Sequence, residues 1–163
     1  LLAGLTGVIL ASGCQPSGAG KGWQLSPAGV SVHDGDRQLC RYLYRGVPNK
    51  PYIDSLRTPT GVNILRDAPH DHLHHRGLMY AVSVDGVVFW EENPKSGRQV
   101  PRDDVETSAP RPIAGLNATS FRQHLDWIAP GRESPLLLEQ RTITVYRGAD
   151  HPSKVTLPVI PKE

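Results

Sequence analysis

The sequence predicts an all-β fold in which an antiparallel meander forms part of a β-sandwich. Apolar and polar residues alternate in several stretches, as they do in strands with one buried face. No stretch shows a convincing helical repeat, and the 15 prolines interrupt most windows in which a helix would have to continue. Turns separate the extended stretches, so consecutive strands are expected to pair antiparallel and to bury their apolar faces against a second layer.

The first two strands are expected to form a hairpin. Val30–His33 is a short extended stretch, Gln38–Arg45 is a longer one rich in tyrosine and leucine, and an Asp-Gly-Asp turn at residues 34–36 separates them. Proline-containing turns follow, and Val62–Leu65 is expected to form a short strand that leads into a histidine-rich segment.

A second hairpin is predicted between Leu78–Val84 and Val87–Trp90. The Asp-Gly pair at residues 85–86 lies between two valines, a pattern typical of a type I′ turn. The apolar runs on either side show little alternation, so both faces of the hairpin are expected to be covered. Residues 91–115 are polar and rich in proline, glycine and charge, and they are expected to form a long loop.

The last two predicted strands are the longest. Polar and apolar residues alternate well in Ala118–Ile128, and Leu136–Tyr146 is β-prone along its length. The turn residues at 130–133 lie between them, so we expect the two strands to pair with each other.

The N-terminal end is typical of a secreted lipoprotein. Residues 1–13 are uncharged and mostly apolar, and they are too few to cross a bilayer, which takes about 20 residues. Small residues precede Cys14 as in a bacterial lipobox, in which the cysteine is lipidated. We therefore expect a signal peptide (1–13), a flexible tether (14–23), a β-sandwich domain (24–147) and an irregular tail (148–163).

Charge and cysteine content narrow the expected partners. The net charge is only +2 and no basic stripe is present, so nucleic acid is not expected as a partner. We expect an exported domain, periplasmic or at the cell surface, that contacts the membrane only through lipid on Cys14. Cys40 is expected to be a buried, inert thiol, and a Cys14–Cys40 disulfide is the alternative where Cys14 is not lipidated.

The highest density of candidate functional side chains lies at residues 69–77, Pro-His-Asp-His-Leu-His-His-Arg-Gly. This segment holds four of the seven histidines. In an extended conformation His70, His72 and His74 would share one face, and imidazoles so placed can converge on one metal ion. A divalent metal held by His72, His74 and Asp71 is one hypothesis, and the cofactor is left open because no well-known metal motif occurs.

A metal-free site is the second hypothesis. A neutral imidazole of His72, His74 or His75 can accept a proton while a carboxylate orients it. Glu91 and Glu92 are the nearest candidate carboxylates in the sequence. The predicted hairpin would bring Trp90 and Glu91 back to the start of its first strand, near Arg76 and His75. In this hypothesis Glu91 assists a catalytic histidine.

Two further side chains suit a sugar ligand. Arg76 can hold a hydroxyl or a carboxylate through its planar guanidinium. Trp90 can pack its ring on the apolar face of a pyranose, although a place in the core is equally compatible with the sequence. A purely structural role, in which the histidines cap turns, is the third interpretation, but several buried imidazoles would need partners.

Residues 50–92 contain four motifs, which are Lys50-Pro51-Tyr52, Leu56-Arg57-Thr58-Pro59-x-Gly61, Asp71-His72-x-His74-His75-Arg76-Gly77 and Asp85-Gly86-x-x-Phe89-Trp90. Together they resemble a family of secreted bacterial proteins that is often labelled "methane oxygenase PmoA". The resemblance extends more weakly over residues 24–147, and it implies a fold similar to the galactose-mutarotase-like β-sandwich of carbohydrate-active proteins. Members of that family are longer, so the chain is expected to be an N-terminal portion of the family domain.

The motifs add Tyr52 and Arg57 to the candidate ligand-binding residues. The sequence as a whole predicts an exported lipoprotein domain that binds or processes carbohydrate, or another small polar ligand, through residues 70–77. The alternatives are a metal-dependent hydrolase or oxygenase with a histidine-built site, and a non-catalytic glycan-binding module.

Overall fold

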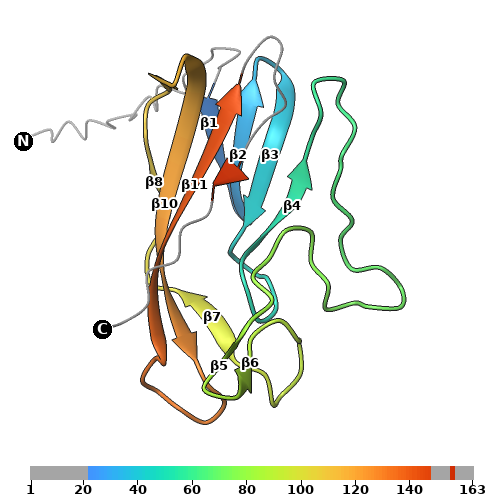
Figure 1. Cartoon of the computed structure of the whole chain (residues 1–163), viewed down its shortest axis with the longest axis vertical. Coiled ribbons are helices and arrows are strands. Elements are labelled where there is room, and N and C mark those ends of the chain that lie inside the picture. The colour runs from blue at the N-terminus through green and yellow to red at the C-terminus, as the bar shows by residue number, and fades with distance from the viewer. Residues whose placement is uncertain (1–21, 148–154, 157–163) are drawn as a thin grey trace, which may run out of the picture.

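The structure is a computed structural model that describes residues 22–147 and 155–156. These residues form antiparallel sheets, and the part of the chain that is described contains no helix and no closed barrel (Figure 1). The predicted all-β class is confirmed. Within the same residues no helix is both long enough and apolar enough to cross a membrane.

The first sheet has the strand order β1-β2-β3-β4. Its strands are β1 (Gly22–Ser26), β2 (Gly29–Asp34), β3 (Arg37–Leu43) and β4 (Tyr52–Leu56). The predicted first hairpin is confirmed, because β2 pairs with β3 up to Asp34 and Arg37. Strand β1 begins at Gly22, two residues inside the predicted tether, and pairs along its whole length with β2.

The second sheet is built around one long hairpin. Strands β10 (Leu116–Ile128) and β11 (Leu137–Arg147) pair from Asn117–Arg147 to Trp127–Leu137, which confirms the two predicted long strands. The predicted loop at residues 91–115 is wrong, because it contains three short strands that all pair with β10. They are β7 (Arg98–Pro101), β8 (Glu106–Thr107) and β9 (Arg111–Ile113), and β12 (Val155–Thr156) pairs with β11 on the other side.

The β5–β6 hairpin forms a small separate sheet. Strands β5 (Ser83–Val84) and β6 (Val87–Val88) are joined by Asp85 and Gly86, which have φ angles of 50° and 77°. Positive φ at both central residues confirms the predicted type I′ turn. The prediction that both faces are covered is wrong, since Val82 is 39% exposed.

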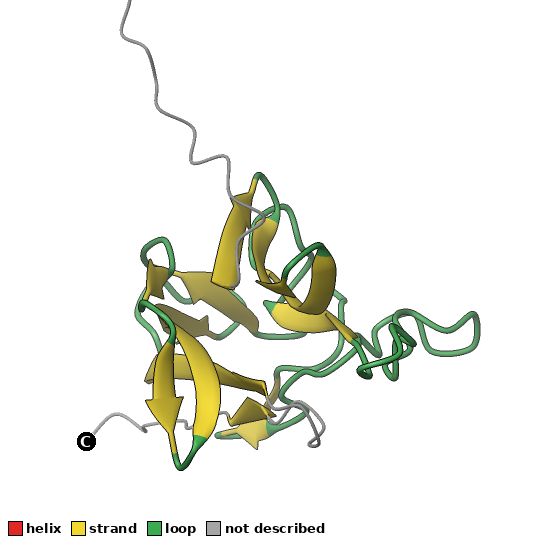
Figure 2. Ribbon diagram, turned by 90° about the horizontal axis from the view of Figure 1, so that it is seen from above, coloured by secondary structure: helices red, strands yellow, loops and turns green. Residues whose placement is uncertain are grey.

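The connection between β4 and β5 leaves the two sheets and projects to one side (Figures 1 and 2). The strand predicted at Val62–Leu65 lies in this connection and is absent from the described strands. Its backbone contacts with β4 and the residues after it are an isolated bridge between Asn63 and Arg57 and hydrogen bonds such as that from Ile64 to Leu56 at 2.9 Å. These contacts do not extend into a ladder, and Val62 and Ile64 are each 61% exposed.

The main core lies between the two sheets. Val30, Val32 and Tyr42 of the first sheet pack with Phe121 and Ile143 of the second, and the rings of Tyr42 and Phe121 are 5.4 Å apart. Cys40 belongs to this core, and burial, reinforced by the nearby Asp54 carboxylate, raises the pKa of its thiol to about 12. The expectation of a buried cysteine is therefore confirmed.

A second apolar cluster attaches the β5–β6 hairpin to the long hairpin. The ring of Phe89 is buried 4.9 Å from the ring of Trp127, and Val84 and Val87 pack against the same cluster. This contact fixes the position of the residues that follow β6. The predicted signal peptide, the lipidated Cys14 and the tail at 148–163 fall, apart from residues 155–156, outside the described residues and stay predictions.

Candidate functional site

The histidine segment lies in the projecting connection between β4 and β5 and is folded into consecutive turns. The amide of His72 donates to the carbonyl of Pro69 at 2.9 Å, and the amide of His75 donates to the carbonyl of His72 at 2.9 Å. The extended conformation considered for residues 70–75 is therefore wrong. Residues 70–75 pair with no described strand, and local turns provide partners for backbone groups of the segment.

These turns bring three imidazoles together instead of alternating them between two faces. The ring of His75 lies 4.7 Å from that of His72 and 4.5 Å from that of His74, and the rings of His72 and His74 are 6.0 Å apart. His70 is exposed and makes no ring contact with them among the contacts of the described residues. The three rings of His72, His74 and His75 are called the imidazole cluster below.

Within the imidazole cluster, His75 and the neighbouring Asp71 have perturbed pKa values. Partial desolvation and the neighbouring rings of His74 and His72 lower the pKa of His75. Asp71 lies 3.2 Å from Nδ1 of His72, and hydrogen bonds from its own backbone amide and from His72 lower the pKa of this carboxyl. Within the described residues no group of three or more His, Cys, Asp or Glu side chains is placed to hold a metal ion.

A cluster of four charged side chains ties the histidine segment to the rest of the domain. Arg76 donates from Nε and Nη2 to the two carboxylate oxygens of Glu92, at 2.8 and 2.7 Å. Lys50, which is fully buried, donates to Oε1 of Glu92 at 2.9 Å and to the carbonyl of Trp90 at 2.6 Å. Asp67 lies 3.7 Å from Nη1 of Arg76 and completes this charge cluster.

Within the charge cluster, mutual pairing opposes the effect of burial on Lys50, Arg76 and Glu92. Burial lowers the pKa of Lys50, and the hydrogen bond to Glu92 opposes that effect. Burial would raise the pKa of Glu92, but hydrogen bonds from Arg76 and Lys50 outweigh it and leave this pKa below its usual range. The same carboxylate raises the pKa of Arg76. Breaking such a cluster by removing one partner is costly, since it leaves an unpaired buried charge.

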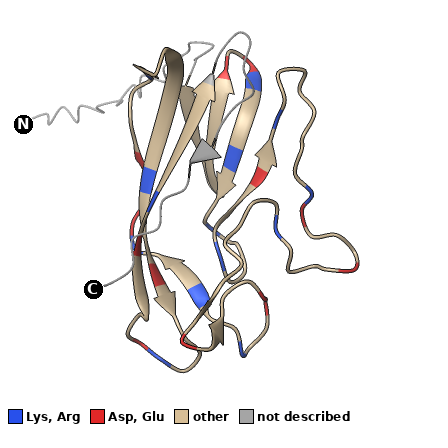
Figure 3. Ribbon diagram, viewed as in Figure 1, with Lys and Arg blue, Asp and Glu red and all other residues tan. Residues whose placement is uncertain are grey.

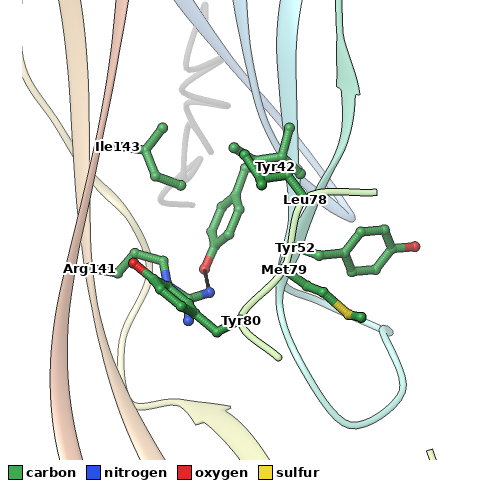
Figure 4. Close-up of a pocket in the computed structure, with 8 residues that line it drawn as sticks. Tyr42, Tyr52, Leu78, Met79, Tyr80, Arg141 and Ile143 are labelled. Atoms are coloured by element: carbon green, nitrogen blue, oxygen red, sulfur yellow. Dashed lines mark hydrogen bonds between the residues drawn. The ribbon is translucent and has the colours of Figure 1, made fainter. Parts of the chain in front are cut away.

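The core between the sheets anchors the segment that carries Lys50. Arg141 is buried on β11, donates to the carbonyl of Pro51 at 3.2 Å and pairs with Glu139 at 2.6 Å. Figure 4 shows its guanidinium between the hydroxyl of Tyr42 and the ring of Tyr80, beside a cavity of about 10 Å³. A chain of polar contacts thus runs from the core through Pro51 and Lys50 to the histidine segment.

An open pocket of about 570 Å³ lies where the histidine segment meets the residues after β6. Its wall combines one apolar side chain with an imidazole, an amide and three charged groups. Glu91 accepts a hydrogen bond from Nδ2 of Asn93 at 2.5 Å, and both side chains face solvent at least in part. The lining residues are Leu73, His74, Arg76, Glu91, Glu92 and Asn93.

The structure brings part of the predicted site together in this pocket. His74, Arg76 and Glu91 line it, and His72 and His75 stand behind His74 in the imidazole cluster. The predicted return of the hairpin to Arg76 is thus observed, but the carboxylate that pairs with Arg76 belongs to Glu92.

The other predicted ligand-binding residues have local roles. Tyr52 is buried, donates from its hydroxyl to Asp67 at 3.3 Å and lies under the guanidinium of Arg76. Arg57 donates to the carbonyl of Gly61 at 2.8 Å and holds the turn after β4. Trp90 is half-buried and is not among the pocket-lining residues, while its carbonyl accepts the hydrogen bond from Lys50.

Sequence reasoning did not identify Lys50 and Asp67 as site residues, and it chose Glu91 rather than Glu92 as the carboxylate that assists a histidine. A lysine before a proline gives no signal that its ammonium is buried, because lysine is almost always exposed. The motif that contains Lys50 was visible, yet its partner is 42 positions away in the sequence. Neighbouring carboxylates such as Glu91 and Glu92 can be told apart only by the direction in which each side chain points.

The geometry defines a two-sheet all-β domain with an open polar pocket beside a projecting loop. A family of unknown function, DUF6807, matches residues 29–158, and the chain belongs to this family. No curated protein and no solved structure matches the chain.

Proposed function

We propose that this chain is an exported, lipid-anchored domain that binds carbohydrate in the open pocket beside the histidine segment. The observation that carries the proposal is the pocket wall, in which the exposed Leu73 lies among an imidazole, an amide and carboxylates. The pocket volume of about 570 Å³ suits a small ligand. The charge cluster behind it holds the wall in place.

The chemistry of the wall matches that of a sugar ring. Hydroxyl groups both donate and accept hydrogen bonds, and Glu91, His74 and Asn93 supply acceptors and donors on one side. Leu73 is 63% exposed, so a ligand that covers it removes apolar surface from water, which is favourable by about 25 cal/mol per Å². The resemblance to the PmoA-labelled family, with its expected galactose-mutarotase-like fold, supports the same ligand class.

His74 and Glu91 are the groups best placed for chemistry on a bound sugar. Both line the pocket, and imidazole and carboxylate groups are common general bases when a ligand hydroxyl reaches them. His72 and His75 contact or approach the ring of His74 and would orient it. In the processing version of the proposal His74 is the base and Glu91 assists it, while in the binding version both only hold hydroxyls.

The proximity of three imidazoles favours one second candidate, a metal-dependent hydrolase or oxygenase. Ring centroids 4.5 to 6.0 Å apart require side-chain rotation before three nitrogens could reach one ion. Elemental mass spectrometry of the purified protein tests this candidate. About one zinc, iron or copper per chain, lost in a His72→Ala variant, would establish it.

Carbohydrate binding is tested by a glycan array probed with the wild type and with His74→Ala. His70→Ala is the matched control, because His70 is exposed in the same segment and does not line the pocket. We expect a defined set of glycans to bind the wild type and the control, with loss of about tenfold or more in His74→Ala. Equal binding by all three proteins, or none by the wild type, would contradict the proposal.

Export and anchoring are tested separately through Cys14. We expect cells that express the full gene to incorporate labelled palmitate into the wild-type protein and to release the Cys14→Ser variant from the membrane fraction. Membrane association that is unchanged in the variant would contradict the lipid anchor without affecting the binding proposal.

A further inference from the structure

We infer that the open pocket selects sugars by charge, favouring amine-bearing glycosides over neutral ones and disfavouring acidic ones. This inference rests on the proposed carbohydrate binding and names the ligand class within it. It depends on which charged groups of the pocket already have partners.

Arg76 is not available to hold an acidic sugar. Its Nε and Nη2 atoms both donate to the carboxylate of Glu92, and its Nη1 atom faces Asp67 at 3.7 Å. A guanidinium presents only one planar set of donors, and two carboxylates occupy most of it. An acidic ligand would have to displace a bidentate carboxylate that is itself held by Lys50.

Lys50 is equally unavailable. Its side chain is fully buried, and its ammonium donates to Glu92 and to the carbonyl of Trp90. It does not line the pocket. The positive charges near the pocket therefore compensate Glu92 and Asp67 and leave none to attract an anion.

Glu91 is the charged group of the pocket wall that lacks a countercharge. No ion pair of the described residues includes it, and its one side-chain partner is the neutral amide of Asn93. Figure 3 shows that acidic and basic residues are interspersed along the ribbon of the described parts of the molecule. A protonated amine beside Glu91 gains a countercharge, and a carboxylate there is repelled.

The experiment compares methyl glucosides that share one ring. Carbon 6 carries a primary amine, a hydroxyl or a carboxylate, and a fourth probe carries the amine at carbon 2. Binding is measured by ligand-observed NMR at about pH 7.5, where the carbon 6 alkylamine stays protonated. The proteins are the wild type, Glu91→Gln, and Glu133→Gln, whose glutamate lies in the exposed turn before β11.

We expect at least one amine to bind the wild type about two- to fivefold more tightly than the neutral glucoside, and the carboxylate to bind most weakly. Glu91→Gln should remove this ranking, so that the amine, hydroxyl and carboxylate probes bind it with similar affinities, while Glu133→Gln should keep the wild-type ranking. An acidic glucoside that binds as well as the amines, or a ranking that survives in Glu91→Gln, would overturn the charge selection alone. Failure of every glucoside to bind would overturn the carbohydrate proposal and the selection with it.

Discussion

Replacing Glu92 by alanine should destabilise the domain more than any other single carboxylate change near the pocket. The substitution removes the shared acceptor of Lys50 and Arg76. Arg76 is 18% exposed and can turn toward water, but Lys50 is 0% exposed and keeps only the carbonyl of Trp90. An uncompensated buried charge costs about 3–5 kcal/mol, and the partial exposure of the cluster places the expected loss near 3 kcal/mol.

Urea denaturation measures this loss directly, with Glu133→Ala as the exposed control. The deficit of Glu92→Ala should also shrink as the pH is raised from about 7 to about 10. Burial lowers the pKa of Lys50 in the folded state, and without Glu92 this pKa falls further below that of the unfolded chain. Between the two values the unfolded chain binds more protons, so the free energy of unfolding of the variant rises with pH.

A loss below about 1 kcal/mol in Glu92→Ala would refute this reasoning, because it would equal the effect of an exposed ion pair. A stability difference between Glu92→Ala and the wild type that stays constant up to about pH 10 would refute the assignment of the pH dependence to Lys50. The first result would mean that the charge cluster does not fix the pocket wall.

Three further predictions concern positions away from the pocket wall. Gly97→Ala should lower the free energy of unfolding, measured by urea denaturation, by about 1–3 kcal/mol, because the added Cβ would lie 2.3 Å from the buried ring of Phe89. Phe89→Leu should destabilise the Gly97→Ala variant less than it destabilises the wild type, and equal losses in the two backgrounds would contradict the clash. Burial would raise the pKa of Asp103, but hydrogen bonds from the backbone and ring of His124 outweigh it and lower this pKa. The stability advantage of the wild type over Asp103→Asn should therefore be present above about pH 4 and fade as the pH falls further; an advantage that persists in acid would contradict the assignment. In a Cys14→Ser background the buried Cys40 should react with Ellman's reagent only after unfolding, and rapid labelling of the folded protein would contradict its burial.

Local sequence signals predicted the elements whose pairing is also local. The β2–β3 hairpin, the Asp85–Gly86 turn and the pairing of β10 with β11 each join neighbouring stretches across a turn. Alternation along β10 was informative because Phe121, Leu125 and Trp127 are all buried, at 3%, 0% and 1% exposure. In these elements the turn residues and the alternation of apolar side chains predict the same strand pairing.

The short strands β7, β8 and β9 could not be predicted because β10 determines them. Each contains two to four residues, too few to show a period, and the prolines at 101 and 112 argue against strands. They form because β10 offers a long edge with unpaired backbone groups. Val62–Leu65 shows the converse, since this β-prone run makes an isolated bridge to Arg57 and a backbone hydrogen bond to Leu56 of β4 without extending into a ladder, and it stays irregular.

The sequence predicted the location of the candidate site more accurately than the contacts within it. The density of histidines beside Arg76 located the pocket, and the hairpin correctly returned the carboxylates to it. Which imidazoles meet depends on turn geometry, and the extended pattern paired His72 with His74 where the turns stack His72 on His75. The buried Lys50 and Arg141 depend on contacts 42 and 90 positions away, which no local pattern encodes.

The central claim is that a glycan binds beside His74 and Asn93. A second groove of about 230 Å³, lined among others by Ser120, Thr142 and Thr144 on the second sheet, offers a rival location within the same domain. The most direct test is a two-dimensional NMR titration of the isotope-labelled protein with the strongest glycan from the array. The proposed function predicts saturable shifts at His74 and Asn93 with little change at Thr142. Shifts confined to the groove of the second sheet, or none at all, would contradict it.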